Sequence, residues 1–236
     1  MLPVHPEYVC VDVATGDDVL AAICFGLEPC RGMAIGARQL GPSPLVEVWR
    51  SPLPVTRGRC SGVSFAANGS VMMGNIAVDG GETEIVTARV YEQLVDGARC
   101  AGYPHLLRVW NHVGGINADD RNLERYKRFS AGRYEALTSR GYAAPEYPAA
   151  SAVGVAGEGV AVYFIASRTP GLQVENPRQV AAYEYPPAYG PRSPSFARAT
   201  VAEWDGGAMI FVAGTSSVVG HTTQHAGDVG KQLDET

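Results

Sequence analysis

Hydrophobic and polar residues alternate along several stretches of the first half of the chain, and this pattern predicts strands. The first 45 residues are rich in Gly and Pro and predict an irregular opening, with a short helical pattern at 17–24 and a Gly-Pro-Ser-Pro loop at 41–44. The dipeptide Asn68-Gly69 favours a hairpin between the strands on either side of it. The strands predicted in this half are residues 46–51, 62–66, 71–78 and 106–110.

Two helices are predicted in the same half by apolar residues that recur at a spacing of three and four. The first begins with Thr83 as its cap and ends near Gly102. The second covers residues 122–139, with Asp119 or Asp120 as its cap. Strands interleaved with two helices in this way predict an α+β layer in which the helices lie on one face of a sheet.

The second half begins as strands without a helix between them. Residues 151–155 and 159–167 are predicted to pair with each other across a turn at 156–158. Residues 228–236 read as the beginning of a helix. Three more strands are predicted at residues 180–185, 197–204 and 209–215.

The whole pattern predicts an α+β fold of two similar sheet-plus-helix halves. A linker at residues 143–148 contains Pro and Tyr, so we expect an N-terminal domain over 1–145 and a C-terminal domain over 146–236. The second domain has a sheet with one uncovered face and a helix that has only begun. We therefore expect the protein to continue beyond Thr236.

Composition and charge narrow the function classes. With 46% hydrophobic and 18% charged residues, the 236-residue chain has the composition of a globular protein. We expect no membrane partner, because no apolar run approaches the roughly 20 residues of a spanning helix. The N-terminus lacks the pattern of a secretory signal, so a cytoplasmic location is expected. The net charge of −5, with scattered Lys and Arg, argues against a nucleic-acid partner.

The cysteines and histidines give no clear metal or disulfide pattern. Five widely spread cysteines without a C-x-x-C pair argue against both a metal site and a disulfide framework. His221 and His225 are four residues apart, a spacing at which two histidines on a helix can bind one metal ion. Gly220 and Gly227 argue against a regular helix there. We therefore predict no metal.

The densest candidate chemistry lies in residues 185–199. Four prolines and a glycine predict a rigid loop, in which Tyr185 and Tyr189 supply hydroxyls and Arg192 and Arg198 supply guanidinium groups suited to carboxylates. Such a loop suits a small dianion. The alternative is a Pro-rich surface loop with solvated arginines, and the residues alone leave both open.

Arg108 is a second candidate because it lies inside an apolar strand, where an unpaired charge is unfavourable. It could bind a substrate anion, form a structural ion pair or point outward. Tyr103, five residues earlier, could reach the same anion as Arg108. Arg168, at the end of a predicted strand, is a weaker candidate because arginines at strand ends are commonly solvated.

Several motifs, in order along the chain, resemble the chorismatase family. The resemblance covers nearly all the chain from about Asp17. The C-terminal half also resembles the small YjgF/RidA-type proteins, whose Pro-Tyr-Ser-Gln-Ala loop corresponds to residues 194–199. The matching segments are residues 46–49, 107–117, 124–129, 132–133, 148–152, 175–177, 189–199, 211–215, 220–221 and 225–228.

The resemblance implies an enzyme that releases pyruvate from chorismate without a metal or an organic cofactor. In the family, a glutamic acid near the C-terminus protonates the enolpyruvyl methylene; that residue is expected beyond Thr236, so the catalytic residue is not assigned within this chain. Gly214 stands where diol-forming members tend to have Ala, which favours 3-hydroxybenzoate, with or without the 4-isomer. The substrate-binding candidates are Arg198, Arg108, Tyr103, Tyr185, Arg168 and Gly214.

Two other functions remain open from the sequence. The likeness of the second half favours an imine or enamine deaminase of the YjgF/RidA type, although the long N-terminal half and the additional arginines argue against it. The third interpretation is a domain that binds a small molecule without catalysis, because the glutamic acid that the resemblance implies is absent from this sequence. The oligomeric state is expected to be a monomer or a small homo-oligomer.

Overall fold

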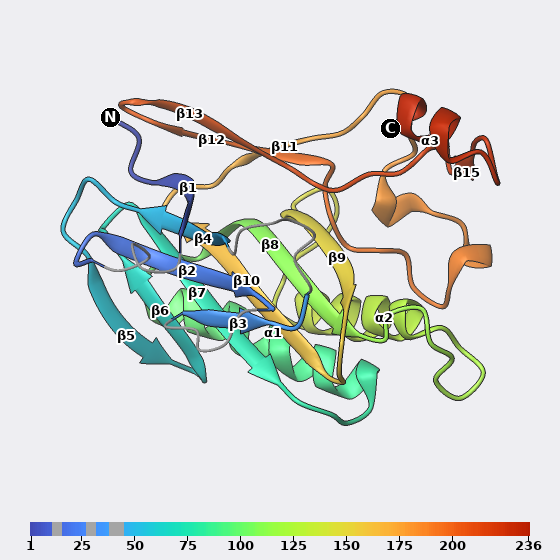
Figure 1. Ribbon diagram of the computed structural model, residues 1–236, viewed down its shortest axis with the longest axis horizontal. Helices are drawn as coiled ribbons and strands as arrows, with labels where there is room; N and C mark the ends of the chain where they lie inside the picture. The colour runs from blue at the N-terminus through green and yellow to red at the C-terminus, as the bar shows by residue number, and fades with distance from the viewer. Residues whose placement is uncertain (11–15, 27–31, 38–44) are drawn as a thin grey trace.

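Six strands form the central sheet of the computed structural model, which describes residues 1–10, 16–26, 32–37 and 45–236 (Figure 1). The order across the sheet is β5 (Thr56–Cys60), β6 (Val63–Ala67), β7 (Val71–Val78), β10 (Val160–Ser167), β8 (His105–Gly114) and β9 (Ala149–Val155). The antiparallel pairing of β6 and β7 confirms the hairpin predicted at Asn68-Gly69, where Gly69 has a positive φ of 86°. The α+β class is confirmed as well.

The predicted pairing of β9 with β10 is wrong. β10 lies between β7 and β8 and is antiparallel to both, while β9 pairs in parallel with β8. Nearly every residue of β10 is buried, which suits a central strand with both faces covered. The sheet therefore extends across the domain boundary expected at 145/146, since β9 and β10 follow it in the sequence.

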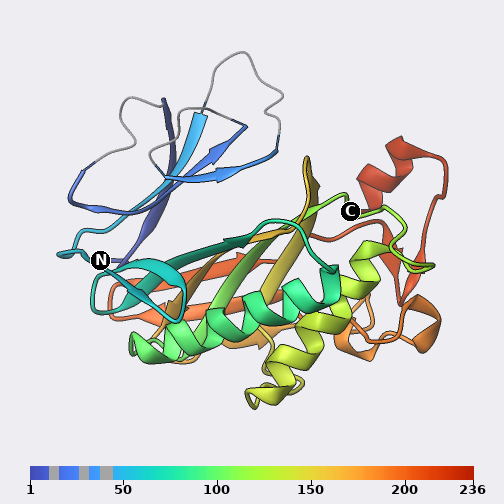
Figure 2. The same cartoon turned by 90° about the horizontal axis from the view of Figure 1, so that it is seen from below.

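Two helices, α1 (Thr83–Cys100) and α2 (Arg125–Ser139), cover one face of the sheet (Figure 2). Both predicted helices are confirmed, but neither predicted cap is. Glu82 occupies the cap position of α1, and Thr83 is already helical. The second helix begins at Arg125 because Arg121 and Asn122 have left-handed backbones, with φ of 57° and 64°.

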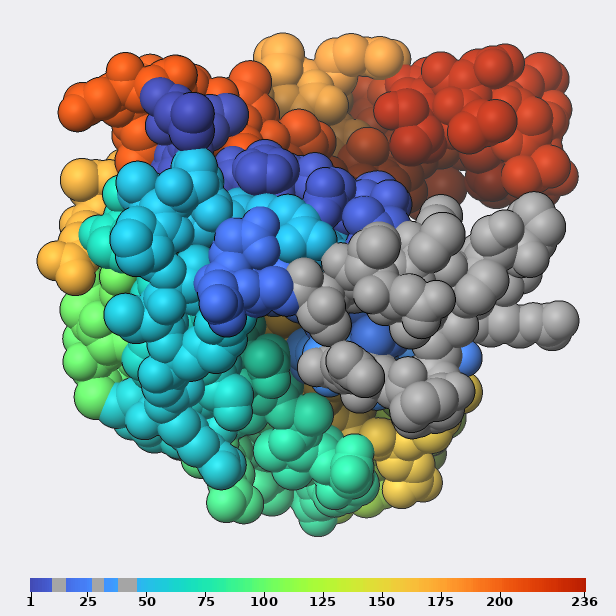
Figure 3. All heavy atoms as spheres, turned by 60° about the vertical axis from the view of Figure 1, so that its left-hand side comes forward, coloured from blue at the N-terminus to red at the C-terminus, as the bar shows by residue number. Residues whose placement is uncertain are grey.

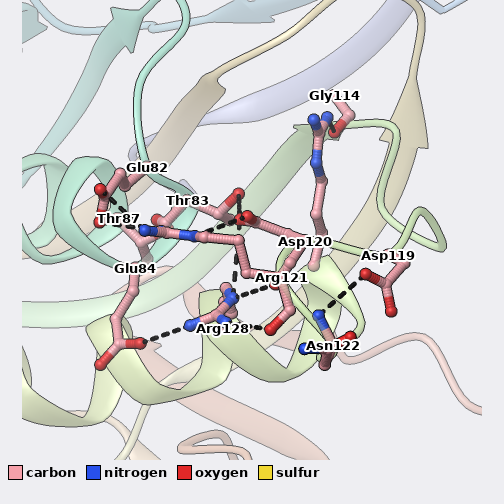
Figure 4. Close-up of polar contacts among 11 residues, drawn as sticks. Glu82, Thr83, Glu84, Thr87, Gly114, Asp119, Asp120, Arg121, Asn122 and Arg128 are labelled. Carbon is pink, nitrogen blue, oxygen red and sulfur yellow. Dashed lines mark hydrogen bonds and ion pairs between the residues drawn. The ribbon is translucent and has the colours of Figure 1, made fainter.

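Arginines from the loop before α2 and from its first turns hold this helix against the beginning of α1 (Figure 4). Arg121 pairs with Glu82 at 2.8 Å, and Arg128 lies 3.6 Å from Glu84 and 3.7 Å from Asp120. We call this group of charged residues the helix clamp. It fixes the position of α2.

A four-stranded sheet covers part of the other face of the central sheet (Figure 2). Its blue residues lie at the surface of the molecule in Figure 3. Its order is β1 (His5–Cys10), β4 (Leu45–Arg50), β2 (Val19–Phe25) and β3 (Met33–Ile35). The predicted strand at 46–51 is confirmed as β4. The helical pattern at 17–24 is wrong, because β2 pairs with β4 and places Ile23 in the core between the two sheets. The loop predicted at 41–44 lies outside the described residues.

A disulfide joins Cys60 at the end of β5 to Cys100 at the end of α1. The argument against disulfides is therefore wrong for this pair. The 40-residue separation of the two cysteines hides their proximity. Packing of α1 against the β5–β6 hairpin brings them together: a Cβ at Gly97 would lie 2.9 Å from the Cys60 carbonyl oxygen.

The C-terminal region forms a smaller sheet of β11 (Leu172–Val174), β12 (Ala199–Trp204) and β13 (Gly207–Val212), followed by β14 (Val218–Val219), β15 (Thr222–Thr223) and α3 (Val229–Glu235). Strand β12 and helix α3 confirm two predictions. The strand predicted at 180–185 is wrong; Ala182–Glu184 form a 3₁₀ turn, as do Pro187–Tyr189. No described helix combines the length and apolar character that crossing a bilayer requires.

Candidate functional site

A cleft of about 440 Å³ lies between α2, β9 and the loop that precedes β12. Helix α2 supplies Tyr126, Phe129, Ser130 and Arg133 to the cleft. Strand β9 supplies a wall of small residues. Its other lining residues are Ala150, Ser151, Ala152, Val153, Ala182, Tyr185, Tyr189, Pro194, Ser195, Phe196, Arg198, Gly214, Thr215, Ser216, Val218, His221 and Thr223.

The electrostatics of the cleft are one-sided. None of the described residues that line it is Asp or Glu, whereas Arg133 and Arg198 both line it. Burial raises the pKa of the Tyr126 hydroxyl, and the charges of Arg133 and Arg198 act on it in the opposite direction. Both guanidinium groups therefore act on the same wall of the cleft. Their combined positive field favours a small anion.

Arg133 carries the least compensated charge in the cleft. Its residue is 3% exposed, and its Nε and Nη2 atoms are buried with no hydrogen-bond partner among the described atoms. Its guanidinium lies 5.1 Å from the ring centroid of Tyr91, which supplies a cation–π contact but no acceptor. Leaving such donors unsatisfied costs about 1–3 kcal/mol each, so an anion bound here would relieve the penalty.

Two hydrogen bonds hold one nitrogen of Arg198, because its Nη2 donates to the Val180 carbonyl at 3.4 Å as well as to the Tyr185 hydroxyl at 2.9 Å. The Arg198 Nε is buried without a partner among the described atoms. The Glu175 carboxylate accepts the Arg198 backbone N–H at 3.4 Å, and burial raises the pKa of this carboxyl. The guanidinium of Arg198 also lies 5.3 Å from the Phe196 ring centroid. Tyr185 thus orients the arginine and leaves part of its fork available.

Arg108 lies next to the cleft rather than in its lining. Its Nη2 donates to the hydroxyl of Ser151, a lining residue, at 2.9 Å, and its guanidinium lies 5.0 Å from the Trp110 ring. Burial lowers the pKa of Arg108 to about 10, and the charge of Arg133 lowers it as well. The outward-facing alternative is thereby excluded, since Arg108 is only 6% exposed.

Gly214 lines the cleft, but it lies beyond the end of β13 and not inside the strand predicted over 209–215. Strand β13 ends at Val212, and its side chains are mostly exposed, with Ile210 at 63%. A Cβ at Gly214 would lie 3.5 Å from the Ser151 Cβ, an ordinary contact distance. The position therefore has room for a methyl group.

Tyr103 and Arg168 are brought together with each other, not with the cleft. The Arg168 guanidinium lies 5.0 Å from the Tyr103 ring, and the Tyr103 hydroxyl accepts the Gly69 N–H at 3.1 Å. Tyr103 precedes β8 and Arg168 follows the antiparallel β10, so both lie at the end of the sheet where those strands begin and end. Neither is among the lining residues of the cleft.

Most of the lining residues were not candidates from the sequence, and Arg133, Ser151 and Ser195 are among the polar ones. Arg133 stood in a matched motif, and its spacing of four from both Phe129 and Leu137 places an arginine in the apolar stripe of a helix. That placement was a usable signal. The serines gave none, because a hydroxyl in a strand or a Pro-rich loop is common.

The two histidines considered for metal binding have different surroundings. His221 lines the cleft, where the Tyr189 hydroxyl donates to its backbone carbonyl at 2.6 Å. His225 lies 3.9 Å from Glu235 of α3. In the described part of the chain, no three His, Cys, Asp or Glu side chains are grouped as metal ligands.

Comparison with known proteins identifies relatives of this chain. The family profile described as chorismatase FkbO/Hyg5-like, N-terminal, matches residues 47–166. A chorismatase of Streptomyces rapamycinicus is 38% identical over 212 residues, covering 88% of this chain and 64% of that protein. A 3-hydroxybenzoate synthase of Streptomyces hygroscopicus is 40% identical over 198 residues, covering 80% of this chain and 58% of that protein.

A solved chorismatase structure superposes with a TM-score of 0.90 at 30% identity, covering 98% of this chain and 74% of the other. The chain thus spans less than two thirds of the length of the two sequence relatives. The family profile alone matches about half of the chain, and the solved structure matches nearly all of it. This chain belongs to the chorismatase family.

Proposed function

We propose that the cleft binds chorismate and that the protein releases pyruvate from it to give 3-hydroxybenzoate, with or without the 4-isomer. One observation carries the proposal: the cleft holds two arginines, and no Asp or Glu is among its described lining residues. The relatives, a chorismatase and a 3-hydroxybenzoate synthase, support the same substrate class.

The substrate's charge and shape suit this lining. Chorismate carries two carboxylates, and Arg133 and Arg198 each keep an unpartnered buried N–H for an acceptor. Phe129 and Phe196 supply apolar surface for a six-membered ring. A hydrogen bond from Arg198 to the Tyr185 hydroxyl holds this guanidinium in place, so it does not need to reorganise when the dianion binds.

The reaction requires a proton at the methylene carbon of the enolpyruvyl ether. Protonation turns the enol ether into a leaving group, and the bond from its oxygen to ring carbon 3 then breaks so that pyruvate leaves. For 3-hydroxybenzoate the oxygen of the neighbouring 4-hydroxyl moves to carbon 3, and for the 4-isomer it stays in place. Loss of a ring proton then aromatises the ring and replaces the proton consumed, so the reaction balances without net water. A carboxylic acid kept neutral by burial suits this step. None of the described lining residues carries a carboxyl group, so the glutamic acid that the family resemblance places beyond Thr236 stays a prediction.

That same observation favours a second candidate, a domain that binds chorismate without converting it. Binding needs the arginines alone, whereas turnover needs the acid as well. Both candidates bind chorismate, but only the enzyme releases pyruvate from it, so a measurement of pyruvate distinguishes them.

The test measures chorismate binding by calorimetry and pyruvate by coupled reduction to lactate. The cleft assignment is supported if chorismate binding is saturable and Arg133→Met weakens it strongly. The control, Arg89→Met on the exposed face of α1, should leave chorismate binding unchanged. Pyruvate release distinguishes the enzyme from the binding domain. Absence of chorismate binding to the unmutated protein would overturn both candidates.

We also predict that the function needs no metal. Treatment with EDTA is expected to leave chorismate binding and any pyruvate release unchanged. Loss of either on chelation, with recovery on adding zinc, would contradict this prediction.

A further inference from the structure

A second hollow, of about 410 Å³, lies behind the loop that bears Arg198. Four tyrosines and Arg192 dominate its lining, and we call it the tyrosine groove. Its lining residues are Tyr134, Thr138, Tyr142, Ala143, Ala144, Tyr147, Tyr183, Pro191, Arg192, Ser193 and Ser195. None of these described residues is Asp or Glu, so the groove has one formal charge, and it is positive.

Arg192 is placed to meet an anion at the mouth of the groove. Its guanidinium lies 4.7 Å from the Tyr134 ring centroid, and its side chain is 49% exposed. The nearest described carboxylate, Glu135, is 3.9 Å away and 65% exposed, which makes the pair weak. The stacked ring fixes the plane of the guanidinium while its N–H groups stay available.

The aromatic part of the lining favours a flat ring as the rest of the ligand. Tyr147 is buried, and its ring lies 5.9 Å from that of Tyr183. Offset or tilted aromatic rings at such distances stabilise a further ring packed among them. The volume falls in the range of small-ligand pockets.

Ser195 gives the groove an unpaired polar group in its depth. The residue is fully buried, its Oγ has no hydrogen-bond partner among the described atoms, and it lines both the groove and the cleft. A hydroxyl or carboxylate oxygen of a ligand would satisfy it. Ser193 of the same groove donates to the Tyr185 carbonyl at 2.8 Å, and Tyr185 in turn holds Arg198.

We propose that the tyrosine groove binds a planar aromatic monocarboxylate, with the carboxylate on Arg192 and the ring among the tyrosines. Equating this ligand class with the hydroxybenzoate product rests on the proposed function. The loop of residues 185–198 then contacts substrate on one side and product on the other, which places the groove where product binding can act on Arg198.

Calorimetric titration with benzoate tests the groove in an Arg133→Met background, which weakens the cleft. We expect benzoate to bind in this background and Arg192→Met to weaken binding at least tenfold, the loss of a charge-assisted hydrogen bond. Arg89→Met, an exposed arginine on α1, is the matched control and is expected to change nothing. Neutral benzamide is expected to bind at least tenfold more weakly than benzoate, a comparison that needs no change at the groove.

Three results would overturn the proposal: no benzoate binding, loss of binding through Arg133→Met alone, or equal effects of Arg192→Met and Arg89→Met. Equal affinity for benzamide and benzoate would do the same. Chorismate binding and pyruvate release are measured separately, so a failure of the proposed function leaves this test intact. Repeating the titration with 3-hydroxybenzoate then shows whether the product belongs to the class that is bound.

Discussion

The helix clamp and the cleft both contain arginines, but they differ in what surrounds the charge. In the clamp, Arg121 and Arg128 lie within ion-pair distance of the carboxylates of Glu82 and Glu84 (Figure 4). In the cleft, Arg133 and Arg198 keep buried N–H groups without partners among the described atoms. An arginine stays charged when buried, so the second arrangement is unfavourable unless an external anion completes it. The clamp arginines stabilise the fold, and the cleft arginines suit a ligand.

The sharpest test of this difference is Arg133→Met. We expect the dissociation constant for chorismate to rise by an amount equivalent to about 2–5 kcal/mol, since a buried carboxylate of the ligand loses its partner. The free energy of unfolding is expected to stay equal or to increase, because an uncompensated buried charge is removed. Calorimetry and urea denaturation measure the two effects.

Arg128→Met is the matched change in the clamp and is expected to act in the opposite way. Its loss should lower the free energy of unfolding by about 1 kcal/mol and leave chorismate affinity unchanged. If Arg133→Met destabilised the protein as Arg128→Met does, without affecting chorismate, both arginines would be structural.

His112 differs from the buried arginines because it can lose its proton, and with it its charge, when it is buried. It is 5% exposed, stacks on Tyr163 at 5.7 Å, and burial lowers its pKa to about 4. The unfolded chain therefore binds the proton more readily, and stability is complete above about pH 6.5 and decreases as the pH falls towards 4. The loss is on the order of 3 kcal/mol. Urea denaturation from pH 7.5 to 4 should show this slope in the parent and a reduced one in His112→Phe; identical slopes would place the pH dependence elsewhere.

Arg198→Lys tests whether the fork, and not the charge alone, is required. Lysine keeps the charge but loses the planar geometry that Tyr185 orients, so we expect about tenfold weaker chorismate binding, about 1.4 kcal/mol. Fluorescence or calorimetric titration measures it. Unchanged affinity, and unchanged kcat and KM wherever turnover is observed, would show that Arg198 does not contact a carboxylate.

The smallest change in structure is Gly214→Ala. The added methyl group would meet Ser151 at an ordinary contact distance, so the free energy of unfolding should change by less than about 0.5 kcal/mol. In a chain extended by the C-terminal part of a relative, we expect the product to shift from hydroxybenzoate toward the dihydrodiol. Chromatography decides the matter, and an unchanged product ratio at similar turnover would place product choice in other residues.

The sequence by itself determined the local elements of the first half. Helical spacing predicted α1 and α2, and Asn68-Gly69 predicted the β6–β7 hairpin, because these signals depend on neighbours within a few residues. The sequence also placed Tyr185 and Arg198 in one loop as separate candidates for binding an anion, and the structure joins them by a hydrogen bond. The motifs also identified the family, whereas two of the binding candidates, Tyr103 and Arg168, lie outside the lining of the cleft.

Only the tertiary structure decided which strands pair and which arginines line the cleft. β10 entered the sheet between β7 and β8 because a strand with two buried faces is more stable inside a sheet than at its edge. Residues 19–25 became β2 because β4 offered backbone partners that a local helical pattern cannot anticipate. Arg133 lines the cleft because the fold brings α2 and β9 to the same hollow, and its Nε and Nη2 atoms are buried there with no partner among the described atoms. A buried charge suits a ligand only where the fold removes water and supplies no carboxylate of its own.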